Sequence, residues 1–166
     1  IEVMQADEQN KPDVAVALAR EWLDEQGVDA LADGSASSTG LAPQQISREK
    51  KRIYLATGPA SSDLTGKFCS PYSMQFAYDT YALAHGTGSA LTKAGGKTWF
   101  FITADYAFGY ALERDTIEAV KAAGGKVLGA VRAPLGTADF SSYLVQAQSS
   151  GAEVIGFANA GTDLQN

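Results

Sequence analysis

The sequence predicts an α/β protein in which parallel sheets are flanked by helices. Along almost the whole chain, short apolar segments alternate with longer segments whose apolar residues recur at helical spacing. The apolar segment 97–103, KTWFFIT, is nearly continuous, as is typical of a strand buried on both faces of a parallel sheet. Strands that alternate with helices of this length are typical of βαβ units, so we expect a Rossmann-like architecture.

In the first half of the chain, apolar segments bounded by turn residues are expected to form strands at 1–6, 28–33 and 52–58. Helical spacing predicts helices at 11–27, 39–50 and 76–94. The first helix has the usual end signals, because Pro12 falls in its first turn and Gly27 follows its last turn. Residues 62–74 are expected to form a loop with a short strand near Phe68.

The second half repeats this order of elements. Apolar segments are expected to form strands at 97–103, 126–133 and 152–158. Helices are expected at 107–123 and at 139–149, and Gly124 and Gly125 mark the end of the first of them. A further helix is expected to begin within the last residues, GTDLQN.

A domain boundary is predicted within 68–77, FCSPYSMQFA, where the alternation of strands and helices lapses and a proline appears. Only about three clear strands are expected on each side, which are few for a finished sheet. We therefore expect two incomplete lobes, at 1–71 and 72–166, with the chain crossing between them near 68–76. A single sheet of six strands is the alternative.

Composition and charge exclude several classes of partner. The 166 residues are 45% hydrophobic and 19% charged, with a formal net charge of −6, which is typical of a globular protein. Basic residues form no stripe, so neither nucleic acid nor an anionic membrane surface is expected as a partner. The basic cluster 48–52 falls at an expected helix end. Cys69 is the single cysteine, which excludes an internal disulfide and a cysteine-based metal site.

The loops that follow the expected strands are the candidates for ligand contact, because ligands of open α/β sheets bind beyond the carboxyl ends of the strands. After Asp33 and Gly34, the hydroxyls of Ser37, Ser38 and Thr39 precede a helix. These hydroxyls serve either to cap the helix or, together with the N–H groups of its first turn, to receive a carboxylate.

Two further strand-end loops have informative side chains. The loop 57–66 follows the next strand and repeats the hydroxyl pattern with Ser61 and Ser62, which favours a shared ligand site on neighbouring strands. After the strand at 97–103, Tyr106 and Phe108 either cover an apolar part of a ligand or staple the start of the helix.

No catalytic or metal-binding pattern in the sequence is complete. The patterns of a phosphate loop, a dinucleotide fingerprint, a calcium loop and a nucleophile elbow each lack a required feature. His85, the single histidine, is expected on the surface or at a helix end, and Asp105 is expected to cap the following helix. We therefore predict a binding protein with no catalytic residue, no metal and no cofactor.

Four segments, taken in order, carry a resemblance to a known family: DEQNKPDVAVALAREWLDEQGVDALADGSASSTGLAP (7–43), YLATGPASSDLTG (54–66), WFFITADYAFGYALERDTIEAVKAAGGKVLG (99–129) and DFSSYLVQAQSSGAEVIGFANAG (139–161). They resemble the type 1 periplasmic solute-binding proteins, more specifically the branched-chain amino-acid receptors of ABC importers. The resemblance implies two α/β lobes joined by hinge strands, with a small carboxylate ligand trapped between them. It also implies a periplasmic location and docking onto the importer's permease subunits.

The resemblance assigns ligand-binding positions residue by residue. In the first lobe, the loop that holds the ligand carboxylate is matched by Ser37 and Ser38. The adjacent loop, which offers backbone and hydroxyl contacts, is matched by Gly58, Pro59, Ala60 and Ser61. In the second lobe, the family's aromatic position is matched by Phe108, with Tyr106 near it. A further loop of that lobe is matched by Asn159, Ala160 and Gly161.

The chain departs from the family pattern in ways that bear on the ligand. The family's first strand with its ligand loop is absent, as is everything after the third strand of the second lobe, which commonly supplies an acid for a ligand's ammonium group. Ala60 stands where amino-acid binders often have a hydroxyl. The implied ligand is therefore an amino acid or an aromatic or hydrophobic carboxylate.

The function expected from these observations is that of the substrate-binding component of an ABC importer. Two alternatives stay open, namely a ligand-sensing effector domain of a regulator or receptor, and an α/β enzyme whose catalytic residues lie outside this stretch. Unpaired sheet edges are also expected where the family's other strands are missing, and such edges favour association with a second copy of the chain.

Overall fold

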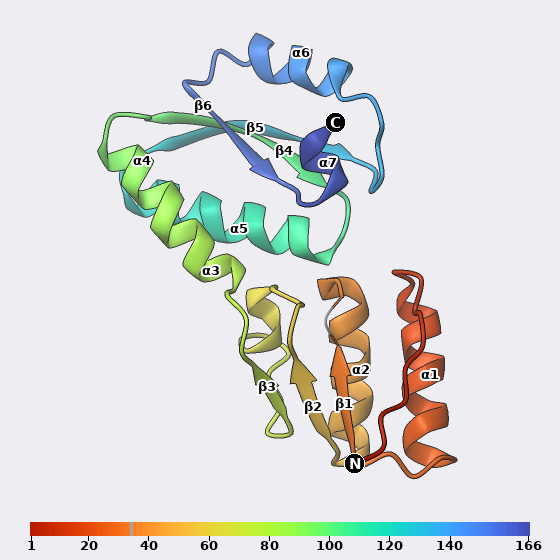
Figure 1. The fold of residues 1–166 in the computed structure, drawn as a ribbon. Helices are drawn as coiled ribbons and strands as arrows, with labels where there is room; N and C mark the ends of the chain where they lie inside the picture. Colours follow the sequence, from red (N-terminus) through yellow and green to blue (C-terminus); the bar gives the residue numbers. More distant parts are fainter. Residues whose placement is uncertain (34) are drawn as a thin grey trace. The chain divides into compact units, whose positions relative to one another are not determined.

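The computed structural model describes residues 1–33 and 35–166, which pack as two compact units, Ile1–Ala77 (unit 1) and Tyr78–Asn166 (unit 2). Each unit contains a three-stranded parallel sheet flanked by helices (Figure 1), and the predicted parallel α/β class is thereby confirmed. The division falls after Ala77 rather than after residue 71, because the strand at 73–75 pairs with the sheet of unit 1.

Unit 1 is built on strands β1 (Ala30–Asp33), β2 (Ile53–Ala56) and β3 (Ser73–Gln75), which lie in that order. Helix α1 (Pro12–Asp24) precedes β1 in the chain, and helix α2 (Ser37–Lys50) links β1 to β2. Apolar side chains from both helices and from β1 and β2 form one core, whose buried members are Ala19, Leu23, Leu31, Ile46, Tyr54, Ala56 and Leu64. The burial of this apolar surface stabilises the unit.

Three predictions for unit 1 are wrong in detail. Residues 1–6 form no strand, because no described segment offers them a hydrogen-bonded ladder, and Ile1 and Val3 are exposed. The expected short strand near Phe68 is absent. The short strand of this segment is β3, which begins five residues later, at Ser73. A 3₁₀ turn, η1 (Ser62–Leu64), stands within the segment expected to be a loop.

Unit 2 has β4 (Thr98–Ala104) at the centre of its sheet, between β5 (Lys126–Ala133) and β6 (Val154–Ala158). Helix α5 (Ala107–Ala122) covers one face, and α6 (Ser141–Ser149) covers the other (Figure 1). Side chains alternate along a strand, so β4 contributes to both faces. Trp99 and Phe101 pack with Val120 of α5. Ile102 packs on the other face with Ala147 of α6 and with Phe140, which precedes that helix.

The segment expected to be one helix at 76–94 begins later, at Thr80. It consists of α3 (Thr80–Leu83), a π-helical turn η2 (Ala84–Gly88) and α4 (Ser89–Lys93). Asp79 sets the start, because its side chain accepts a hydrogen bond from the Ala82 N–H. The final helix, α7 (Thr162–Gln165), follows β6 directly.

Parallel strands place the loops of interest together within each unit. In unit 1, the segments that follow β1 and β2 leave the same edge of the sheet, and in unit 2 the same holds for the segments that follow β4, β5 and β6. Among the described residues, no helix is long and apolar enough to cross a membrane.

Candidate ligand-binding loops

Ser37 ties the two predicted ligand loops of unit 1 to each other. Its side chain is buried, with 2% of its surface exposed. Its hydroxyl oxygen accepts hydrogen bonds from the N–H groups of Ala60, at 3.2 Å, and Ser61, at 3.0 Å. The start of α2, after β1, and the loop after β2 are therefore hydrogen-bonded to each other, and the shared ligand site expected from the hydroxyl pattern stays a prediction.

The Ser37 and Thr39 hydroxyls do not cap the following helix. Helix α2 begins at Ser37 rather than at Thr39, and Ala36 occupies the N-cap position without a side-chain hydrogen bond. The Thr39 hydroxyl is buried inside the first turn and donates to the Ala36 carbonyl oxygen at 3.1 Å. Capping is therefore the wrong interpretation of Ser37 and Thr39, because both lie within the helix instead of before it.

The loop after β2, Gly58–Ser61, is held from several sides. The Pro59 carbonyl accepts a hydrogen bond from the Gln75 side-chain amide at 2.9 Å, and the Ser61 hydroxyl accepts one from the Asp63 N–H at 3.2 Å. A Cβ on Gly40 would stand 2.4 Å from the ring of Pro59, so only glycine allows α2 this close. Pro59, Ala60 and Ser61 are buried, whereas Gly58 is half-buried.

Asp33, at the end of β1, is a polar residue that the sequence indicated only as a turn. Its carboxylate accepts hydrogen bonds from the Ser35 N–H at 2.8 Å and from the Tyr54 hydroxyl at 3.4 Å. Burial raises the pKa of Asp33, and the charge of Glu8 raises it further. Burial also raises the pKa of the Tyr54 hydroxyl. Gly34, the other half of the predicted turn, lies outside the described residues.

In unit 2, Tyr106 and Phe108 occupy different environments. Tyr106 is the N-cap residue of α5 and is half-buried, whereas Phe108 is buried, with 8% of its surface exposed. The two ring centroids lie 5.9 Å apart. Burial raises the pKa of Tyr106 to about 12, and the charges of Asp163 and Tyr78 contribute to that rise. Tyr106 is therefore the aromatic side chain of this loop that stays partly open to solvent.

The loop after β6 is divided between buried and exposed residues. Asn159 is buried, and its side-chain N–H donates to the Asp163 carbonyl oxygen at 3.1 Å. Ala160 and Gly161 are exposed, and Gly161 has the left-handed backbone conformation that favours glycine. Asp163, which the sequence did not single out, is buried and accepts a hydrogen bond from the Gly136 N–H at 3.0 Å. Its partner is 27 residues away in the chain, so no local pattern identified it.

Other predicted polar residues lie away from these loops or have a different role. Asp105 does not cap α5; it accepts a hydrogen bond from the Tyr110 hydroxyl. His85 is exposed, as expected, and its ring lies 4.0 Å from that of Tyr81. Glu113, which the sequence did not indicate, is buried between the Thr103 hydroxyl and the Arg132 guanidinium.

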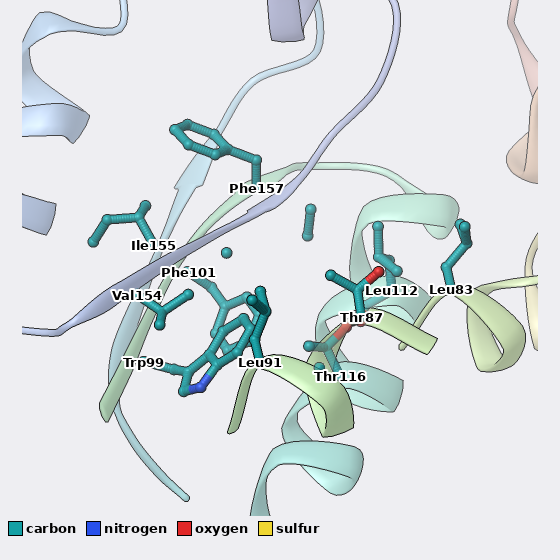
Figure 2. A pocket seen from close by; sticks show the side chains of 13 residues that line it. Leu83, Thr87, Leu91, Trp99, Phe101, Leu112, Thr116, Val154, Ile155 and Phe157 are labelled. Atoms are coloured by element: carbon teal, nitrogen blue, oxygen red, sulfur yellow. Dashed lines mark hydrogen bonds between the residues drawn. The ribbon is translucent and has the colours of Figure 1, made fainter. Parts of the chain in front are cut away.

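An apolar groove of about 270 Å³ lies elsewhere in unit 2, along β6 (Figure 2). Trp99, Phe101, Val154 and Phe157 come from the sheet, and Leu91 comes from α4. None of the predicted ligand-binding residues lines this groove. Among the described residues, no group of three or more His, Cys, Asp or Glu side chains could hold a metal ion.

Comparison with known proteins decides the family. A family model described as "Periplasmic binding protein" matches residues 1–166. The chain belongs to the periplasmic binding protein family. The resemblance predicted from the four sequence segments is thereby confirmed.

Solved structures of periplasmic binding proteins have the same fold. A periplasmic binding protein from Burkholderia mallei is 57% identical, with a TM-score of 0.96 over 99% of this chain and 44% of that chain. A branched-chain amino acid ABC transporter periplasmic ligand-binding protein from Burkholderia xenovorans is 39% identical. The match has a TM-score of 0.69 and covers 90% of this chain and 40% of that chain. A solute-binding protein of an ABC transporter from R. palustris, in complex with 4-hydroxybenzoate, is 26% identical. The match has a TM-score of 0.81 and covers 93% of this chain and 42% of that chain.

The chain spans 37% of the length of a curated relative, the Leu/Ile/Val-binding protein homolog 6 of Brucella abortus, to which it is 29% identical over 152 residues. The match covers 92% of this chain. This periplasmic binding protein therefore corresponds to less than half of each relative named here.

Proposed function

We propose that this chain is part of the ligand-capturing receptor of an ABC importer. It binds a small organic carboxylate, an amino acid or an aromatic acid, without transforming it, in the periplasm, and delivers it to permease subunits. The observation that carries the proposal is the pair of strand-end loops that the Ser37 hydroxyl holds together. The family model, which matches residues 1–166, supports it as well. Loops at the carboxyl ends of parallel strands are where such folds bind ligands.

In unit 1, the first turn of α2 receives the ligand carboxylate. The N-terminal end of a helix favours an anion, and Ala36 at the N-cap position supplies no side-chain acceptor to that turn. The half-buried Ser38 adds a hydroxyl that donates to the carboxylate. The buried Ser37 positions the loop Gly58–Ser61 beside this turn instead of contacting the ligand itself.

In unit 2, the partly exposed residues of the strand-end loops contact the rest of the ligand. Tyr106 supplies an aromatic ring, and the exposed Ala160 and Gly161 supply a backbone surface. Phe108 packs behind Tyr106 in this scheme, because its own side chain is buried. Binding of the ligand favours the conformation of the protein that makes the most contacts with it, and this change is what the permease detects.

The test is thermal unfolding of the full-length protein against a panel of amino acids and of aromatic and aliphatic carboxylates. A ligand at about 100 times its Kd adds about 2.7 kcal/mol to the free energy of unfolding, which raises the Tm by a few degrees. We expect Ser38→Ala to weaken the affinity for the active ligand about tenfold, because it removes a hydrogen bond to a charged group.

The matched control is Ser142→Ala, which removes an exposed hydroxyl from α6 and leaves the strand-end loops untouched. Its affinity for the ligand is expected to equal that of the unsubstituted protein. A panel in which no carboxylate changes the Tm contradicts the proposal and favours a sensor of another class of ligand.

Association of the 166-residue chain with itself is proposed as a second, separate property. In each sheet, two of the three strands pair on one side only, and unpaired strand edges favour pairing with another chain. Light scattering at high concentration is expected to detect dimers or larger species, and a strictly monomeric chain contradicts the idea.

A further inference from the structure

A groove of about 720 Å³, the α2 groove, runs along helix α2 in unit 1. The α2 residues that line it recur at three- and four-residue spacing, so they share one face of the helix. They include Ser38, Leu41, Ala42, Gln45, Arg48 and Glu49. Phe68, from the segment after η1, lines the groove as well. The helix rises about 16 Å from the first of these α2 residues to the last, so the groove has the length of a partner segment rather than that of one small carboxylate.

The backbone that carries Phe68 is fixed against α2. The buried Gln44 donates from its side-chain amide to the carbonyl oxygens of Leu64, at 3.0 Å, and of Phe68, at 2.7 Å. The Phe68 N–H donates to the Asp63 carbonyl oxygen at 2.9 Å. The Phe68 side chain nevertheless stays 46% exposed. An exposed aromatic residue on a fixed backbone is typical of an interface anchor, because little conformational entropy is lost when a partner covers it.

The charged side chains at the groove favour a negatively charged partner. The acid among the lining residues, Glu49, is already paired with Arg20 of α1 at 3.3 Å. Arg48 is exposed, and within residues 1–33 and 35–166 its guanidinium forms no ion pair. The Lys67 ammonium lies 4.9 Å from the centroid of the Phe68 ring. Two cations beside apolar surface match acidic side chains on an amphipathic segment.

The α2 groove begins at the proposed carboxylate contact. Ser38, the hydroxyl proposed above to donate to the ligand carboxylate, also lines the groove. Ser37, the residue before it, holds the loop after β2 by accepting hydrogen bonds from two backbone N–H groups. One helix of unit 1 therefore carries the ligand contact in its first turn and the groove along the turns that follow.

We propose that the α2 groove is the surface on which the importer's permease docks, through a helix that has acidic and apolar side chains on one face. The acidic side chains pair with Arg48 and Lys67, and the apolar ones pack against Leu41 and Phe68. A helix suits this surface because residues at three- and four-residue spacing form ridges against which a second helix packs. The inference rests on the proposed function, in which the receptor delivers its ligand to permease subunits.

The first experiment measures docking of the full-length receptor onto the importer held in lipid nanodiscs. The receptor is loaded with the carboxylate that raises its Tm in the panel described above, and surface plasmon resonance gives the Kd of docking. Arg48→Glu and Phe68→Ala are each expected to weaken docking at least about tenfold, because arginine and aromatic side chains dominate the affinity of interfaces. Neither is expected to change the Kd of the carboxylate more than about twofold, because neither side chain contacts it in the proposed site.

Two matched controls make the same changes elsewhere. Lys121→Glu reverses an exposed cation in the last turn of α5, as Arg48→Glu does in the last turn of α2. Phe157→Ala removes a phenylalanine ring that is 44% exposed on β6. Both variants are expected to dock as tightly as the unsubstituted receptor.

A second measurement needs no variant. The docking Kd of the unsubstituted receptor is followed as NaCl is raised from about 0.05 to about 0.5 M. It is expected to rise at least about tenfold, because salt screens the attraction between exposed charges. Docking that is insensitive to salt overturns the inference even if a variant does not fold.

The outcomes separate this inference from the proposed function. Docking of Arg48→Glu and Phe68→Ala at full affinity overturns the inference and leaves a carboxylate receptor standing. The same holds if Phe68→Ala abolishes a dimer in sedimentation, because a second copy then occupies the groove. It also holds if either variant loses affinity for the carboxylate itself, because the groove is then a small-molecule site. If the unsubstituted receptor binds no carboxylate and does not dock, the proposed function fails and this inference fails with it.

Discussion

Replacing Ser37 by alanine tests whether one hydroxyl holds the ligand loops of unit 1 together. The Ser37 oxygen accepts hydrogen bonds from two buried backbone N–H groups, those of Ala60 and Ser61. The substitution Ser37→Ala removes this acceptor while the backbone of α2 keeps its helical conformation, since alanine is the best helix former. The two N–H groups are then left buried without a partner.

The size of the effect follows from those two donors. Each buried donor left without an acceptor costs about 1–3 kcal/mol, so the loss for both lies between about 2 and 6 kcal/mol. Partial relaxation of the loop lowers this value, and we expect unit 1 to lose about 3 kcal/mol of stability. For a unit of this size, that corresponds to a Tm lower by about 12–24 °C.

The assay exploits the two tryptophans, one in each unit. Trp22 lies on α1 of unit 1, and Trp99 lies on β4 of unit 2. In a Trp99→Phe background, the fluorescence of Trp22 alone reports the urea unfolding of unit 1. The midpoint of this transition is expected to fall in Ser37→Ala and to stay unchanged in the control Ser142→Ala. A loss below about 1 kcal/mol, the contribution of one ordinary hydrogen bond, refutes the idea that Ser37 locks the two loops.

Two further predictions concern the ends of the strands. In Gly109→Ala, the added Cβ would stand 2.1 Å from the Ala104 carbonyl oxygen, which is backbone and cannot move aside, so circular dichroism is expected to record a loss of more than about 2 kcal/mol in unit 2. In Asp33→Asn, the comparison is the free energy of unfolding at pH 3 and pH 7. The pKa of Asp33 is raised above its ordinary 3.8 in the folded protein, so the stability that this group contributes is greatest at low pH and is lost as the pH rises through the raised pKa. The variant is therefore expected to be more stable than the unsubstituted protein at pH 7 and equal to it at pH 3.

The regular part of the fold was predictable because it depends on local patterns. Helix α5 was expected at 107–123 and lies at Ala107–Ala122, since its apolar stripe and the following glycines are both local signals. The segment 1–6 shows the limit of such reasoning. Its apolar residues suit a strand, but a strand exists only when another segment pairs with it, and this information is not contained in the segment itself.

The location of the candidate site was predictable, but the task of each side chain within it was not. The rule that ligands bind beyond strand ends selects loops that the fold does place at the carboxyl ends of the strands in both units, and ligand binding by these loops stays a prediction. It does not reveal that Ser37 and Phe108 are buried, because their burial depends on the loop after β2 and on the packing around α5. Asp163 was missed for the same reason, since its partner Gly136 belongs to a different loop.

The strand-end loops of the two units differ in how far their polar groups satisfy one another. In unit 1, the loop groups already satisfy one another: Ser37 engages two N–H groups, and the N–H groups of Thr57 and Gly58 both donate to the Asp33 carbonyl. In unit 2, Asn159 and Asp163 keep acceptors that the described chain does not satisfy. A rigid, self-satisfied loop can position a feature that all candidate ligands share, such as a carboxylate. Unsatisfied acceptors discriminate strongly, because a ligand without a donor leaves them buried and unpaired.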